Sequence, residues 1–158
     1  MADLLVRLYD LPEFEATARV AAAGIDIRRA LTPERYIVLD WVRQRFAAPW
    51  VGEVAAGMGR LPVSVLVAVK EGQLLGFACY DTTARGFFGP TGVAEEARHQ
   101  GIGESLLIAT LRAMRDEGYA YGVIGDPGPV AFYQKRLDAI EIPGSEPGVY
   151  RGMLRAKT

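Results

Sequence analysis

The stretch VAEEARHQGIGESLL, residues 93–107, is the most informative part of the chain. It begins where a predicted strand ends, and its two glycines, Gly101 and Gly103, stand at the start of a predicted helix. Glycine lets the backbone approach a ligand closely, and the first N–H groups of a helix have no partner within that helix. The positive end of the helix dipole lies at the same place. The pattern therefore predicts a seat for a diphosphate.

Two common phosphate-binding loops do not fit this stretch. A Walker loop requires Lys and then Ser or Thr after its last glycine, whereas Gly103 is followed by Glu104 and Ser105. A dinucleotide fingerprint requires a third glycine three residues after Gly103, and Leu106 stands there. An ordinary glycine-containing turn between a strand and a helix remains the alternative interpretation.

The spacing Arg98-x-x-Gly101-x-Gly103 resembles the acetyl-CoA loop of the GCN5-related N-acetyltransferases, the GNAT family. That loop has Arg or Gln, two residues, Gly, one residue, and then Gly or Ala. A second segment, PVAFYQK at residues 129–135, resembles an Ala-x-x-Phe-Tyr-like segment on a later helix of the family. Because the two motifs occur in the family's order, together they indicate the family more specifically than either motif alone.

The predicted elements follow the order of this family over nearly the whole chain. Strands are predicted over 4–9, 63–70, 74–80, 87–93, 119–124, 139–142 and 149–154, and helices over 13–23, 32–46, 103–117 and 129–137. This β-α-α-β-β-β-α-β-α-β-β order predicts an α/β fold, with a mixed sheet and helices on both of its faces. The stretch 47–60, with a proline and three glycines, is predicted to be a loop with a short helical turn. The last two strands are predicted to form a hairpin.

The resemblance implies a V-shaped splay between the fourth and fifth of these strands, 87–93 and 119–124. Pro90 supports it independently, because proline cannot donate a hydrogen bond to a neighbouring strand. Acetyl-CoA would lie in the splay as co-substrate, with no metal. The expected cofactor-binding residues are Thr91, Gly92, Val93, Arg98, His99, Gln100, Gly101, Ile102, Gly103, Glu104, Ser105, Phe132 and Lys135.

The resemblance also implies catalytic roles. The backbone N–H of Val93 would polarise the thioester carbonyl. Tyr133 would protonate the departing thiolate, and packing in the core is the alternative for this side chain. An ammonium must lose a proton before it attacks, and Asp126 is the predicted base. Glu53 and Asp81 are more remote candidates, and a chain of waters could replace any of them.

The cofactor loop departs from the family in its charge. Between residues 94 and 104, Glu95, Glu96 and Glu104 oppose Arg98 alone, while CoA itself is polyanionic. We therefore expect weak, salt-dependent binding, unless residues 135 and 136 or a neighbouring subunit supply positive charge.

The composition bounds the other possibilities. The chain has 158 residues, which predicts one domain over 1–158. Its net charge of −1 removes the usual electrostatic argument for a nucleic-acid partner. The single cysteine, Cys79, and the single histidine, His99, argue against an internal disulfide and a metal site. Without a long apolar run, no membrane span is expected and a cytoplasmic location is predicted.

Taken with the resemblance, these observations predict an N-acetyltransferase that acts on a primary amine of a small molecule or peptide. The amine would attack acetyl-CoA directly in a ternary complex. Tyr36, Trp41 and Trp50 are candidates for lining the acceptor pocket, with core packing as their alternative. A catalytically silent acyl-CoA-binding sensor or scaffold is the competing function, and a phosphate-binding protein of another kind is a third. The resemblance is compatible with a homodimer.

Overall fold

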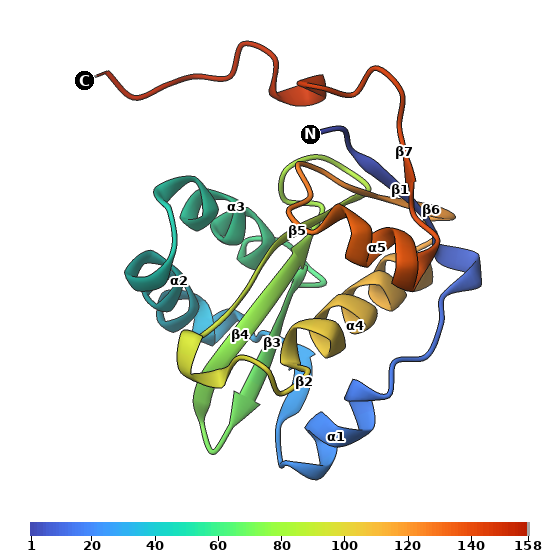
Figure 1. Cartoon of the computed structure of the whole chain (residues 1–158). Helices are drawn as coiled ribbons and strands as arrows, with labels where there is room; N and C mark the ends of the chain where they lie inside the picture. Colours follow the sequence, from blue (N-terminus) through green and yellow to red (C-terminus); the bar gives the residue numbers. More distant parts are fainter. Residues whose placement is uncertain (158) are drawn as a thin grey trace.

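A mixed sheet forms the centre of the computed structural model, which describes residues 1–157 (Figure 1). The strands are β1 (Leu4–Arg7), β2 (Asp26–Arg29), β3 (Val65–Lys70), β4 (Gln73–Tyr80), β5 (Phe87–Val93), β6 (Tyr121–Ile124) and β7 (Ile140–Glu141). The helices are α1 (Ala16–Ala22), α2 (Arg35–Arg45), α3 (Ala48–Met58), α4 (Ile102–Asp116) and α5 (Val130–Leu137). The seven strands are ordered β2-β3-β4-β5-β6-β1-β7, and only β5 and β6 run parallel. The predicted α/β fold is confirmed.

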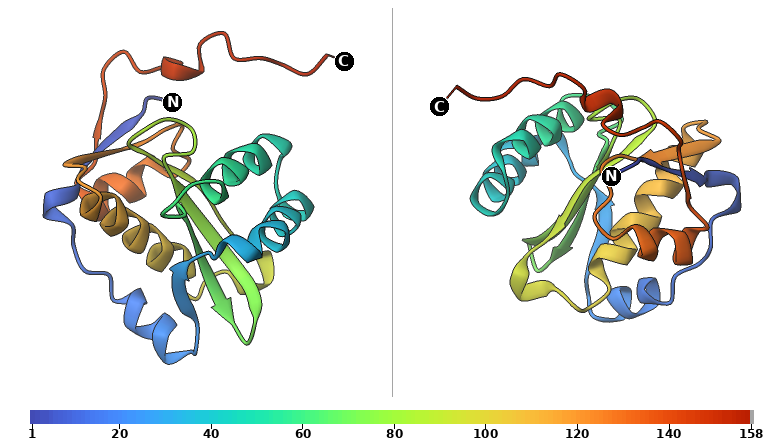
Figure 2. Two further views of the ribbon diagram at one scale, coloured as in Figure 1. Left: turned by 180° about the vertical axis from the view of Figure 1, so that it is seen from behind. Right: turned by 45° about the horizontal axis from the view of Figure 1, so that its top comes forward.

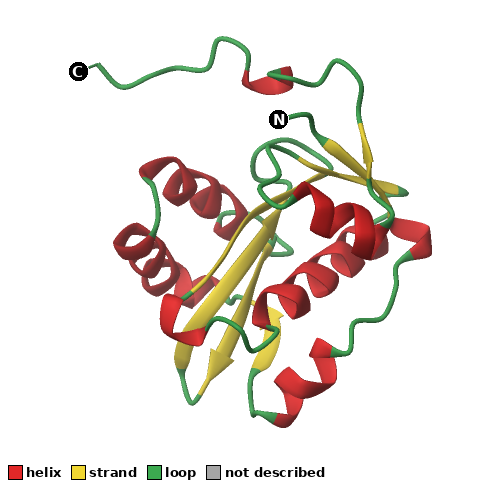
Figure 3. Ribbon diagram, in the orientation of Figure 1, coloured by secondary structure: helices red, strands yellow, loops and turns green. Residues whose placement is uncertain are grey.

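Helices cover both faces of the sheet, as Figures 2 and 3 show from several sides. Helices α2 and α3 lie on one face, while α4 lies on the other with α1 and α5 beside it. The buried side of α4 includes Leu107, Leu111 and Met114, at the spacing that places side chains on one stripe of a helix. Burying each of them contributes roughly 1.5–3 kcal/mol, which fixes α4 and its first turn on the sheet. Among residues 1–157, no helix is long and apolar enough to cross a membrane.

Strands β5 and β6 pair only briefly before they part. Phe87 is opposite Val123 and Phe88 is opposite Ile124, and β6 ends there while β5 continues to Val93. Pro90, which has no N–H to donate, lies in the part of β5 that faces no partner strand on this side. The predicted splay is therefore confirmed between these two strands.

Helix α3 lies where the sequence predicted a loop. Pro49 is in its first turn, where proline is favoured because its missing N–H would have no helical partner. Val54 and Met58 bury the apolar face of the helix. Gly57 is needed for close packing, because a Cβ there would come within 2.8 Å of a methyl group of Val65. Gly57 is therefore required by the contact of α3 with β3, and the helix continues past it.

The two ends of the sheet also differ from the prediction. The short edge strand β2 was not predicted, because its sequence DIRR is mostly charged and shows no apolar alternation. The predicted final hairpin is wrong. Strand β7 pairs with β1, and residues 149–154 form no strand. Gly148 and Gly152 adopt left-handed conformations that interrupt an extended chain, and the segment beyond β7 runs over the top of the molecule in Figure 1.

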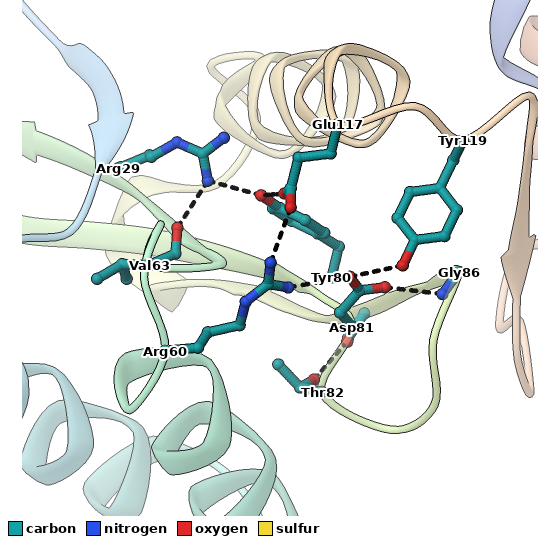
Figure 4. A network of polar contacts seen from close by, with 10 residues as sticks. Arg29, Arg60, Val63, Tyr80, Asp81, Thr82, Gly86, Glu117 and Tyr119 are labelled. Atoms are coloured by element: carbon teal, nitrogen blue, oxygen red, sulfur yellow. Dashed lines mark hydrogen bonds and ion pairs between the residues drawn. The ribbon is translucent and has the colours of Figure 1, made fainter.

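A network of polar side chains fixes the loop that leads into β5 (Figure 4). Asp81 accepts hydrogen bonds from the Gly86 N–H at 2.7 Å and the Tyr119 hydroxyl at 2.8 Å, and pairs with Arg60 at 2.9 Å. Arg60 also pairs with Glu117 at the end of α4. Through these contacts Asp81 helps to hold the beginning of the splay in place. Its role as a remote candidate base stays a prediction.

Candidate functional site

A cavity of about 680 Å³ lies beside the part of β5 that has separated from β6. We call it the splay cavity, and it is lined by Phe88, Thr91, Gly92, Val93, Ala97, Arg98, His99, Gly101, Ile102, Gly103, Glu104, Leu107, Pro129, Phe132 and Tyr133. Its walls come from β5, the following loop, the first turn of α4 and α5. This volume falls in the range of small-molecule and cofactor sites, which are mostly apolar with a few placed polar groups.

One end of the splay cavity is the N-terminus of α4. The first intrahelical bond runs from the Ser105 N–H to the Gly101 carbonyl, so the N–H groups of Ile102, Gly103 and Glu104 have no helical partner. Among residues 1–157, no side chain caps these N–H groups. Gly101 precedes them in a left-handed conformation, with a φ of 88°, that glycine adopts without strain. Free N–H groups and the helix dipole therefore meet at a cavity wall, which suits an anion.

The exposed edge of β5 supplies further donors. The Ala94 N–H donates to the Leu75 carbonyl on β4, so the alternation of a strand turns the N–H groups of Val93 and Thr91 the other way. They face the splay, where β6 no longer pairs with β5. An extended ligand with its own carbonyl groups could take the place of the missing strand.

Tyr133 brings a titratable hydroxyl to the wall opposite β5. It lies on α5 with 8% of its surface exposed. Burial raises the pKa of Tyr133, so its hydroxyl stays protonated at neutral pH and can act as a proton donor.

A sequence model described as Acetyltransferase (GNAT) family matches residues 25–138, well over half of the chain. The chain belongs to the GNAT family. No curated protein matches it in sequence. The residues that match the family model run from β2 through α5 and include every wall of the splay cavity.

Solved structures share the GNAT fold at low identity. A fungal multi-domain GH3 β-N-acetylglucosaminidase with a GCN5-related glucosamine N-acetyltransferase region has a TM-score of 0.74 and 16% identity, over 89% of this chain and 19% of that one. A GCN5-related N-acetyltransferase from Sphaerobacter thermophilus has a TM-score of 0.61 and 18% identity, over 89% and 48%. A GNAT family acetyltransferase from Brucella melitensis in complex with acetyl-CoA has a TM-score of 0.52 and 21% identity, over 70% and 80%. The chain thus spans less than half of the first two.

Most of the residues predicted to bind the cofactor of a GNAT protein lie together in this cavity. Thr91, Gly92, Val93, Arg98, His99, Gly101, Ile102, Gly103, Glu104 and Phe132 line it, as does Tyr133. Gln100, Ser105 and Lys135 do not. Ser105 is turned into the core with 2% of its surface exposed, whereas Gln100 and Lys135 face solvent. Neighbouring residues of the loop and of the first turn of α4 thus point to different faces. The loop motif alone does not predict which of them face the cavity.

Asp126 lies outside the splay cavity. It is exposed, and its backbone N–H donates to the Asp3 carboxylate at 3.3 Å. The pKa of Tyr150 is raised by burial and then by the charges of Asp3, Glu53 and Asp126. Carboxylates from three distant segments therefore act electrostatically on one tyrosine hydroxyl, a relationship that the sequence order does not reveal.

The three aromatic candidates for an acceptor pocket separate in the structure. Trp41 is buried against Phe77, with ring centroids 6.1 Å apart, and Trp50 stacks on Phe46 at 5.0 Å. Tyr36 is 79% exposed and lies with Trp41 along a second cavity of about 1050 Å³. None of the three lines the splay cavity. Trp41 therefore packs in the core, which was the alternative interpretation for these side chains.

Two arginines reach the cofactor loop from other elements. Arg136 of α5 pairs with Glu104, and Arg19 of α1 lies beside Gly101. Arg136 was anticipated as a source of positive charge, whereas nothing in the sequence around Arg19 points to the loop. The contact arises because α1 packs on α4.

The single cysteine is a buried thiol. Cys79 lies within β4 with no exposed surface, and burial raises its pKa well above the ordinary value. A protonated, inaccessible thiol does not act as a nucleophile, so Cys79 has a structural role.

Proposed function

We propose that this GNAT protein transfers an acetyl group from acetyl-CoA to a primary amine of a small molecule or peptide. The observation that carries the proposal is the splay cavity, in which an uncapped helix N-terminus, two outward N–H groups of β5 and the Tyr133 hydroxyl line one space. The GNAT relative from Brucella melitensis in complex with acetyl-CoA supports the choice of acyl donor.

The fit to a CoA thioester follows from the order of these groups along the cavity. The N–H groups at the start of α4 would bind the diphosphate. The outward N–H groups of Thr91 and Val93 would pair with the amide groups of the pantetheine arm and with the thioester carbonyl oxygen. Acetyl-CoA supplies an acyl carbon that accepts a nucleophile.

The reaction needs proton transfers at both ends. The acceptor ammonium first loses a proton, its nitrogen forms a bond to the acyl carbon, and the carbon–sulfur bond breaks. Tyr133 donates its hydroxyl proton to the departing sulfur and regains one that the nitrogen gives up through solvent. The net products are the amide, CoA as its thiol and one released proton.

Asp126 remains the proposed base, acting through water because its carboxylate does not reach the cavity wall. Asp3, whose carboxylate accepts a hydrogen bond from the Asp126 N–H, adds negative charge at the end of β6. Such a field would attract a cationic amine and would stabilise the proton as it leaves.

Release of CoA thiol from acetyl-CoA, measured with a panel of primary amines, tests this function. We expect amine-dependent thiol release in the wild-type protein and a large loss in Tyr133→Phe. CoA binding without turnover on any amine would favour the competing sensor or scaffold. Binding of nucleotides without binding of CoA would exclude both functions.

A further inference from the structure

An ion pair lies at the first turn of α4, the helix N-terminus to which the proposed function assigns the diphosphate of CoA. Of its two partners, Glu104 lines the splay cavity and Arg136 does not. The Glu104 carboxylate accepts two hydrogen bonds from Arg136 of α5. The Nη1–Oε1 and Nη2–Oε2 distances are 3.1 Å and 3.4 Å. The negative charge of Glu104 therefore stands at the helix N-terminus that an entering anion would use.

The two partners of this pair are held very differently. The guanidinium of Arg136 lies 4.5 Å from the ring centroid of Phe14 and 5.8 Å from that of Phe132. These rings hold it by cation–π contact whether or not Glu104 is present. Within residues 1–157, the Glu104 carboxylate has no hydrogen bond or ion pair other than that with Arg136. The carboxylate can therefore leave while the arginine stays.

A carboxylate and a phosphate offer Arg the same two-pronged arrangement of oxygens. Resting on the function proposed above, we propose that the diphosphate of CoA replaces Glu104 at Arg136. Glu104 thus acts as an internal competitor for the arginine, which the rings of Phe14 and Phe132 hold in place, and its carboxylate must swing out when the cofactor enters. In this exchange Arg136 is a diphosphate-binding residue, and Glu104 lowers the affinity of the protein for CoA.

A double-mutant cycle of CoA dissociation constants, measured by calorimetry, tests the exchange. Glu104→Gln should tighten CoA binding about three- to tenfold, because the competing charge is gone. Arg136→Gln should weaken it roughly tenfold, as expected for a charge-assisted hydrogen bond. In the double variant the gain from Glu104→Gln should vanish, because the arginine that it frees is absent. Arg136→Lys, with thermal melting of every variant, separates a binding effect from loss of packing on Phe14.

Matched controls separate the exchange from general repulsion. Glu95→Gln makes the same change of charge in the same loop, at an exposed residue outside the cavity lining, and should leave the affinity within about twofold. Dephospho-CoA, which keeps the diphosphate, should show the full gain in Glu104→Gln, whereas pantetheine, which lacks it, should show none.

Different experimental results would overturn the exchange and the proposed function. An equal gain from Glu104→Gln with and without Arg136, or an equal gain from Glu95→Gln, would overturn the exchange and leave the proposed function standing. A complete lack of CoA binding by the wild type and by every variant would overturn both.

Discussion

The guanidinium of Arg19 lies against Gly101, with Nη2 only 3.1 Å from the point where a Cβ on that glycine would stand. The two residues are far apart in sequence and come together because α1 packs on α4. Arg19 forms no ion pair within the part of the chain that the structure describes. Its charge is therefore available to offset the acidic residues of the loop.

Replacing Arg19 should expose how much the loop depends on this charge. We expect Arg19→Gln to weaken CoA binding about three- to tenfold and to reduce its dependence on salt, because a cation beside the diphosphate is lost. Calorimetric titration with CoA between low and high salt measures both effects. Arg155→Gln, the same change in the exposed C-terminal segment, is the control. Equal losses in the two variants would show that Arg19 acts only through the total charge.

Gly92 should tolerate no side chain. A Cβ there would lie 2.5 Å from Cζ of Phe46, whose ring is confined by Trp41, Trp50 and Phe77. We expect Gly92→Ala to lower the free energy of unfolding by about 1–3 kcal/mol through overpacking. Chemical denaturation measures the change.

Gly52→Ala is the matched control for this substitution. Gly52 lies within α3 with nothing within 4 Å of a Cβ, so alanine there should stabilise by about 0.5–1 kcal/mol through helix propensity. If neither Gly92→Ala nor Gly52→Ala changes the free energy of unfolding, the contact with Phe46 does not constrain β5.

Tyr133→Phe should separate proton donation from binding. We expect kcat for amine acetylation to fall about 100-fold or more, with little change in CoA affinity, because only the hydroxyl is removed. The raised pKa of Tyr133 means that the proton donor is lost only as pH rises through a value above the ordinary 10.0. The wild type should therefore show no decline from this group at neutral or mildly alkaline pH. A kcat unchanged by the substitution would leave Tyr133 as a packing residue.

The pair between Arg28 and Glu34 should make stability sensitive to acid. The hydrogen bonds from Arg28 lower the pKa of Glu34 from its ordinary 4.5 to about 2, helped by the Leu31 N–H. Because the folded pKa is the lower one, the stabilisation is complete above pH 4.5 and is lost as pH falls toward 2. Both side chains are partly exposed, so we expect only about 1 kcal/mol.

Thermal melting between pH 6 and pH 2, roughly the range of carboxylate titration, checks this expectation. Glu34→Gln should flatten the loss of Tm on acidification relative to the wild type. Glu13→Gln, at an exposed carboxylate, should not. The same acid loss in all three proteins would mean that other carboxylates control it.

The sequence alone was enough to predict most of the strands and helices and the splay between β5 and β6. The apolar spacing of α4, the two glycines before it and the proline in β5 are local signals, and each constrains backbone conformation directly. They predicted β5, the splay and α4, which the structure confirms, whereas the diphosphate site at the start of α4 stays a prediction.

Contacts between distant segments were decided only by the tertiary structure. Which surfaces pack together decides several of these contacts. They are the position of Arg19 beside Gly101, the contact of the Phe14 ring with Arg136, the hydrogen bond between Asp126 and Asp3, and the pairing of β7 with β1. Local sequence records the conformation that a residue prefers, because that preference arises within a few bonds. The identity of its neighbour across the fold depends on how whole helices and strands bury their apolar faces, and no single stretch of the chain contains that information.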